Sequence, residues 1–319
     1  MRGFRRSQST SFESEVAYAS ANSRVATQET ASLLPRRDYG PILVAVNGHS
    51  ASWDALDWAT AEAAARQCAL RILHTIDWPS PIPDISGGTA VSQWDASAEE
   101  VGARVLEEAA CRARSVAPSL SVTTHVHLGA LASALLQEGR EVALLVLDRE
   151  RPGSVSKHVI RKAGCPVAIV ELSNKAPRGS SCGRVVVSVD GTGDPTAAIG
   201  FAFRAAQRRG IGVTAILPWM ARNALRCDAQ FADVVRMCQA AYPDVEVRQR
   251  LAAAPTGPAL VAESAGAALI VLGSRAGGRA RRGTFESVDT VLRSVRAPVV
   301  IVRTAAAKRR RGARGKDTK

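Results

Sequence analysis

The feature that most constrains the fold is an internal repeat, because one order of apolar runs and turns occurs twice along the chain. The first apolar run of one copy ends at Asn47, the first run of the other ends at Asp190, and a glycine follows each. The last run of each copy begins directly after a proline, Pro166 or Pro298. Short apolar runs that alternate with helical periodicity are typical of buried parallel strands joined by helices. The repeat therefore predicts two tandem α/β domains, each a doubly wound parallel sheet of five strands.

The apolar runs also set the expected domain boundaries. We expect strands at 42–46, 71–76, 121–127, 142–147 and 167–170 in the first copy, and at 185–189, 211–217, 245–251, 268–272 and 299–302 in the second. The first domain is predicted to span 40–173 and the second 184–303. A Pro-, Gly- and Ser-containing linker, 174–183, joins them. Residues 1–39 and 304–319 lack sustained periodicity, and we expect a disordered N-terminal arm and a disordered basic tail.

Positive charge gathers at the C-terminus. The formal net charge is +13, and eight basic residues against one acidic residue fall from Arg303 onward. Such a run normally stays solvated, although it would attract nucleic acid or an acidic partner in a salt-sensitive way. No aromatic side chains are interleaved with it to stack on bases. The solvated tail is therefore the favoured interpretation, with nucleic acid or an acidic protein as the alternative.

Cysteine usage and hydropathy indicate the compartment. The six cysteines form no C-x-x-C pair and have no histidine partner at zinc spacing, so no metal site is expected. No run reaches the roughly 18 consecutive apolar residues that a membrane helix requires. A reduced, cytoplasmic location without membrane contact is the prediction.

Ligands of open parallel sheets bind beyond the carboxyl ends of the strands, where the strand order reverses. In each copy this places two loops at the candidate site, one after the first strand and one after the fourth. A glycine-rich turn that leads into a helix presents backbone N–H groups to phosphates. The loops after the first and fourth strands are therefore the places to look for binding residues.

The strand ends of the second copy resemble those of the universal stress protein family. They are Val189-Asp190-Gly191-Thr192 after the first strand and Val271-Leu272-Gly273-Ser274-Arg275 after the fourth. Gly153-Ser154 and the prolines before both fifth strands are similar as well. The resemblance covers roughly 42–170 and 184–302 and implies a Rossmann-like, adenine nucleotide alpha hydrolase-like fold in each domain.

The resemblance also implies binding residues for an adenine nucleotide such as ATP. In nucleotide-binding members an Asp after the first strand meets the ribose, and a G-x-x-G, nine residues and a Gly-Ser/Thr hold the phosphates. Carried over to the second copy, the candidates are Asp190, Gly191, Thr192, Gly273, Ser274, Arg275, Gly277 and Ser287.

The second copy departs from that pattern at two places. Ala276 stands where the second glycine is expected, and Glu286 enters the final Gly-Ser whether one counts forward from Gly273 or back from Pro298. A carboxylate about 4 Å from a phosphate costs on the order of 1 kcal/mol in water and about 4 kcal/mol at an effective dielectric of 20. At a helix N-terminus, Glu286 would compete for the position that the phosphate takes. Nucleotide binding in the second domain is therefore expected to be weak.

The first copy departs further. Asn47 replaces the ribose-binding Asp, and only five residues separate Leu147 from Gly153, so the glycine-rich loop is missing. Gly48 and Ser154 remain from the pattern. Asn47 is expected to shape its turn rather than bind ribose, which makes the first site degenerate.

The resemblance implies a non-enzymatic stress-response or regulatory protein, with weak ATP binding in its second domain. The alternative is an interaction scaffold with both sites defunct, and slow ATP hydrolysis is a weaker third reading. Family members commonly pair through their fifth strands, here 167–170 and 299–302. That pairing is open between an internal pseudo-dimer and a homodimer of two chains.

Overall fold

A computed structural model describes ten stretches of the chain, which together contain the elements expected from the repeat. They are residues 40–76, 90–149, 154–171, 183–189, 194–217, 224–251, 256–263, 266–275, 282–295 and 297–304. The expected N-terminal arm, the linker at 174–182 and the tail from residue 305 lie outside these residues.

The first half alternates strands and helices. Its elements are β1 (Ile42–Ala45), α2 (Ser50–Arg66), β2 (Leu70–Ile76), α3 (Ala90–Val116), β3 (Val122–Leu128), α4 (Leu131–Glu138), β4 (Leu144–Asp148), α5 (Ser154–Lys162) and β5 (Val167–Val170). The strands lie in the order β3-β2-β1-β4-β5 and pair in parallel. With 27 residues, α3 is the longest of the described helices.

The second half repeats this arrangement. Its elements are β6 (Val185–Val189), α6 (Thr196–Arg209), β7 (Val213–Leu217), α7 (Ala224–Ala241), β8 (Val247–Leu251), α8 (Thr256–Glu263), β9 (Leu269–Arg275), α9 (Arg282–Ser294) and β10 (Val299–Thr304). Its strand order, β8-β7-β6-β9-β10, matches that of the first half, and these strands are also parallel. The predicted fold class, two doubly wound five-stranded sheets, is therefore confirmed.

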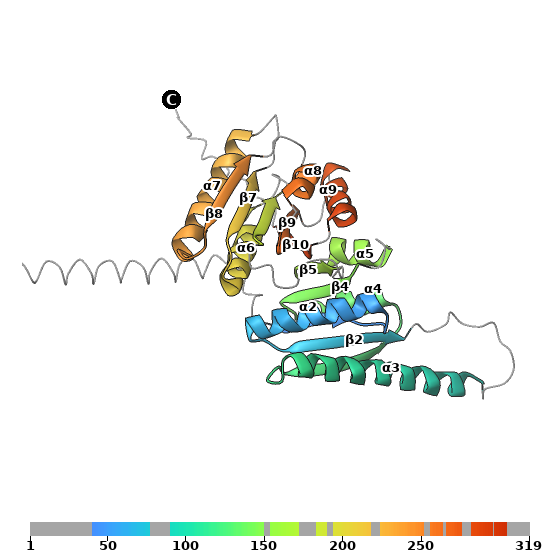
Figure 1. Cartoon of the computed structure of the whole chain (residues 1–319). Coiled ribbons are helices and arrows are strands. Elements are labelled where there is room, and N and C mark those ends of the chain that lie inside the picture. Colours follow the sequence, from blue (N-terminus) through green and yellow to red (C-terminus); the bar gives the residue numbers. More distant parts are fainter. Residues whose placement is uncertain are drawn as a thin grey trace, which may run out of the picture.

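The two halves form one continuous ten-stranded sheet (Figure 1). β5 and β10 pair antiparallel at the centre, with Ile169 opposite Val299 and Val167 opposite Ile301. This joint is the one antiparallel pairing among the described strands. The fifth strands thus pair within the chain, in the arrangement expected for an internal pseudo-dimer.

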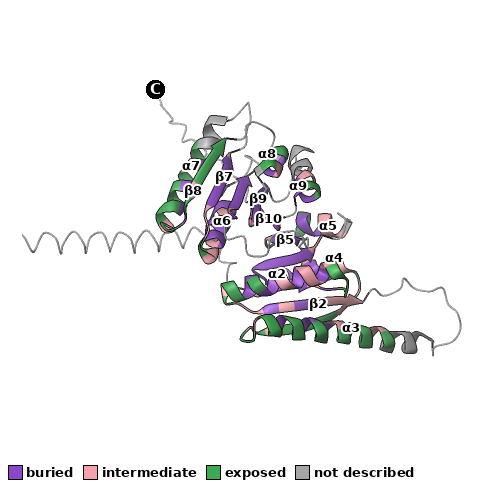
Figure 2. Cartoon of the chain, in the orientation of Figure 1, coloured by how far each residue is buried: buried purple, intermediate pink, exposed green. Residues whose placement is uncertain are grey.

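The core lies on both faces of this sheet, and each layer runs through both halves. One cluster of buried side chains joins α2 and α3 to α6 and α7, with Leu56 and Phe203 among its largest members. The other joins α4 and α5 to α8 and α9. The central strands β5 and β6 are buried, whereas the edge strand β8 is largely exposed (Figure 2). The opposite edge strand, β3, is largely exposed as well. Continuous apolar runs therefore correspond to inner strands covered on both sides.

Opposite charges face each other across the joint at equivalent positions of the two halves. Lys157 of α5 and Asp289 of α9 each precede the proline of the following strand by nine residues. The Lys157 Nζ donates to the Asp289 Oδ2 at 3.0 Å. In a symmetric pair of identical halves, these positions would carry the same charge. The pairing of Lys157 with Asp289 therefore favours the joint between the two different halves of one chain.

Candidate functional site

In the second half, the two strands that precede the loops of the candidate site lie next to each other. β6 and β9 are adjacent parallel strands, and Val189 at the end of β6 is in register with Gly273 of β9. Parallel strands in register end at the same edge of the sheet. β6 ends at Val189. The candidate residues that follow it, Asp190, Gly191 and Thr192, lie outside the described residues.

Gly273 allows a close approach between β9, β6 and α6. A Cβ added at this position would lie 2.6 Å from the Val189 Cγ1 and 3.1 Å from the Ala198 Cβ. Non-bonded carbon atoms in van der Waals contact lie about 3.5–4.0 Å apart. A separation of 2.6 Å would therefore be a steric clash. Packing against β6 and α6 therefore requires a glycine at position 273, the position that the family pattern also gives to a glycine. Ser274, the next residue, is buried, and Arg275 ends β9 in register with Thr304 of β10.

The helix after the second loop begins earlier than the sequence pattern suggests. α9 starts at Arg282, so Glu286 and Ser287 lie beyond its first turn, and that turn contains no acidic residue. This differs from the expected placement of Glu286 at the helix N-terminus. Ala276 and Gly277, in the loop itself, lie outside the described residues.

Sequence reasoning missed a Gly-Thr pair at the start of this helix. Gly283 and Thr284 are the second and third residues of α9. The pair can be seen in the sequence. The family spacing of nine residues after position 276 leads to positions 286 and 287 instead, beyond this pair. Backbone N–H groups in the first turn of a helix have no partner within the helix and bind anions readily. The α9 start therefore has the backbone chemistry that a phosphate site needs.

In the first half, the turn after β1 is closed by its own hydrogen bonds. The Asn47 Oδ1 accepts from the His49 N–H at 3.0 Å, and Gly48 has a left-handed φ of 82°. The Ser52 Oγ donates to the His49 carbonyl at 2.8 Å. The Asn47 side chain therefore takes part in the hydrogen bonds of its own turn.

The segment after β4 in the first half contacts the other half of the chain. The Arg149 Nη1 donates to the Glu171 Oε2 at 2.9 Å and to the carbonyl oxygen of Val295, just after α9. The Arg149 side chain is 11% exposed, and burial lowers the pKa of its guanidinium. Ser154 begins α5, whereas Gly153 lies outside the described residues. The segment after β4 is shorter than the equivalent segment after β9. Its Arg149 makes a contact with the second half of the chain.

Three further findings bear on the other expectations. Within the described stretches, no group of three His, Cys, Asp or Glu side chains is placed to hold a metal ion. Cys68, Cys111, Cys165 and Cys238 form no disulfide bond within the described residues. None of the helices in the described part of the chain is both long and apolar enough to span a bilayer.

Comparison with known proteins finds one family along the whole repeat. Residues 38–171 and 182–303 each match the model of the universal stress protein family. A universal stress protein of Mycobacterium tuberculosis strain H37Rv is 27% identical over 299 residues, covering 84% of this chain and 98% of that protein.

Solved structures show the same likeness. The crystal structure of a universal stress protein from Archaeoglobus fulgidus has a TM-score of 0.63 at 17% identity, covering 83% of this chain and 96% of that chain. A universal stress protein in complex with cAMP is 25% identical, with a TM-score of 0.34, and covers 43% of this chain and 99% of that chain. The tandem arrangement is thus shared with full-length relatives of this chain.

Proposed function

The chain belongs to the universal stress protein family, and on that premise we propose that it is a non-enzymatic stress-response regulator whose second half binds ATP weakly. The first half acts as the structural partner that completes the ten-stranded sheet. One nucleotide binds per chain, at the carboxyl edge of β6 and β9.

The close packing at Gly273 carries this proposal. It holds the end of β9 against the end of β6 and against α6, with no room for a side chain at that position. Asp190 directly follows β6, and the phosphate loop directly follows β9. The ribose-binding and phosphate-binding positions of the family pattern therefore start from neighbouring, tightly packed strands.

The α9 N-terminus supports the phosphate end of the same site. Its first turn contains Gly283 and Thr284 and no acidic residue, and the positive end of a helix dipole favours an anion. The loop before it is rich in arginine, including Arg279 and Arg281. Glu286 is the fifth residue of the helix, beyond the first turn in which backbone N–H groups lack a partner within the helix.

The asymmetry between the halves predicts the stoichiometry. The Asn47 oxygen is engaged by the His49 N–H, and Arg149 contacts the second half where a phosphate loop would begin. We therefore expect that the first half does not bind a nucleotide. Binding is therefore expected at one site rather than two.

Isothermal titration of ATP into the full chain tests the proposal, with equivalent substitutions in the two halves as matched variants. We expect saturable binding of one ATP per chain. Asp190→Ala removes the ribose contact and weakens binding about tenfold or more, as expected for a hydrogen bond to a charged group. Asn47→Ala, the equivalent change in the first half, leaves the affinity unchanged.

Three outcomes would contradict the proposal. Equal losses in Asp190→Ala and Asn47→Ala would remove the distinction between the halves. Binding that appears only after Glu286→Gly would mean that this carboxylate closes the site. No binding in either the unmodified chain or Glu286→Gly would leave an interaction scaffold as the function.

A further inference from the structure

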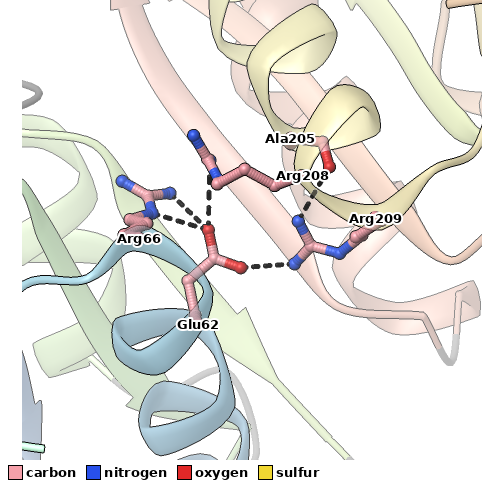
Figure 3. A network of polar contacts seen from close by, with 5 residues as sticks. All are labelled: Glu62, Arg66, Ala205, Arg208 and Arg209. Atoms are coloured by element: carbon pink, nitrogen blue, oxygen red, sulfur yellow. Dashed lines mark hydrogen bonds and ion pairs between the residues drawn. The ribbon is translucent and has the colours of Figure 1, made fainter.

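The two halves also meet at a polar cluster far from the nucleotide site. It consists of Glu62 and Arg66 from the last two turns of α2 and of Arg208 and Arg209 from the last turn of α6 (Figure 3). We call it the α2–α6 cluster. β2 and β7 begin shortly after these helix ends, so the cluster lies at the amino edge of the sheet, opposite the carboxyl edge that holds the nucleotide site.

One buried carboxylate in this cluster faces three guanidinium groups. The Glu62 Oε1 accepts from the Arg66 Nε at 2.6 Å and from the Arg208 Nη2 at 3.4 Å. The Glu62 Oε2 accepts from the Arg209 Nη2 at 2.5 Å. The side chains of Glu62 and Arg66 are only 2% and 6% exposed. The cluster therefore carries two positive charges in excess at a buried interface.

Some of its donors have no acceptor among the residues that the structure describes. The Arg66 Nη2 and the Arg208 Nε are buried and donate no hydrogen bond there. The Arg66 Nη2 lies 2.6 Å from the Glu62 Oε1 and forms an ion pair with it. The geometry of this contact does not meet that of a hydrogen bond. Buried N–H groups that lack an acceptor are costly, most of all on charged side chains. An additional anion would satisfy them.

The surroundings hold these groups in place and favour an added negative charge. The Arg66 guanidinium lies over the Phe201 ring at 5.1 Å, a contact from α2 to α6 that fixes its plane. Burial and the neighbouring Arg66 together lower the pKa of Arg208 to about 10, although Glu62 opposes the shift. An anion bound here would offset the repulsion between these guanidinium groups.

We propose that the α2–α6 cluster binds a phosphate group, as a free phosphate dianion or as a phosphomonoester. Guanidinium groups match the oxygens of a phosphate geometrically, and the charge of a dianion equals the excess of the cluster. Arg208 and Arg209 are 23% and 22% exposed, so the site opens to solvent on the α6 side. Because the cluster joins the two halves, bound phosphate stabilises their pairing.

The test measures phosphate binding to the full chain in chloride buffer at constant ionic strength. Titration calorimetry and the Tm are followed with inorganic phosphate and with glycerol 3-phosphate; the tighter ligand identifies the source. We expect saturable binding of one phosphate per chain and a Tm that rises with its concentration. Arg208→Gln weakens binding about tenfold, whereas Arg236→Gln, an exposed arginine on α7, changes nothing.

Two more variants separate this site from a structural ion pair and from the nucleotide site. Glu62→Gln leaves three guanidiniums without their carboxylate, so its Tm should depend more steeply on phosphate than that of the unmodified chain. A loss of Tm that is the same at every phosphate concentration would show a structural role and overturn the proposal. So would the absence of saturable phosphate binding, or equal affinity in Arg208→Gln. Asp190→Ala should leave phosphate binding intact, and loss of binding in that variant would place the phosphate at the nucleotide site instead.

Discussion

Replacing Gly273 by alanine tests whether close packing positions the candidate site. The new methyl carbon would lie 2.6 Å from the Val189 Cγ1, about 1 Å inside an optimal contact. Val189 cannot turn away cheaply, because a β-branched side chain is stiff at χ1. On the other side, the Ala198 Cβ of α6 lies 3.1 Å away. Relief therefore requires β9, β6 or α6 to move.

The expected cost follows from this overlap. Overpacking of this kind costs about 1–3 kcal/mol, which for a domain of this size lowers the Tm by roughly 2–12 °C. Thermal and urea unfolding followed by circular dichroism measure the loss, and titration with ATP measures its effect on the site. We expect a lower Tm together with weaker ATP binding, because the two loops start from the displaced strands.

A double-mutant cycle with Val189→Ala isolates the contact. Val189→Ala removes the Cγ1, so adding Gly273→Ala to that background should cost less than about 1 kcal/mol, and the coupling energy should fall in the usual range of about 0.5–3 kcal/mol. If Gly273→Ala destabilised both backgrounds equally, the contact between Gly273 and Val189 would not be the reason for the glycine. A stable Gly273→Ala protein would refute the packing argument directly.

Two further predictions concern the joint between the halves. Burial raises the pKa of the Glu62 carboxyl, but Arg66 and the arginines of α6 outweigh burial and hold the pKa below its ordinary value. The stability that this carboxylate contributes is therefore complete above its unfolded pKa and is lost as the pH falls through the folded pKa. Urea unfolding from neutral into acid solution should show a shallower loss of stability in Glu62→Gln, and equal slopes would contradict the linkage. Charge reversal by Lys157→Asp or Asp289→Lys should each destabilise the chain by about 0.2–1 kcal/mol, and the double reversal should restore the Tm; a double variant as unstable as the sum of the two would show that the pair does not interact.

Much of the fold could be predicted because its signals are local. The runs that end at Asn47 and Asp190 are apolar on both faces, as inner strands of a covered parallel sheet must be. Gly273 could be singled out from its place after such a run, and the turn-shaping role of Asn47 from its side chain. The start of α9 could not be placed by counting, because a helix begins where its backbone and packing allow rather than at a fixed distance from a motif.

The sequence by itself determined the two doubly wound halves and the family to which the chain belongs. Only the tertiary structure decided that β5 meets β10 within one chain, that Arg149 contacts the second half and that three arginines surround Glu62. The physical reason is that the first group of features depends on periodicity and turns within a few residues. The second depends on contacts between residues more than a hundred positions apart, such as Glu62 and Arg209, and no local pattern in the chain records which of these partners will meet.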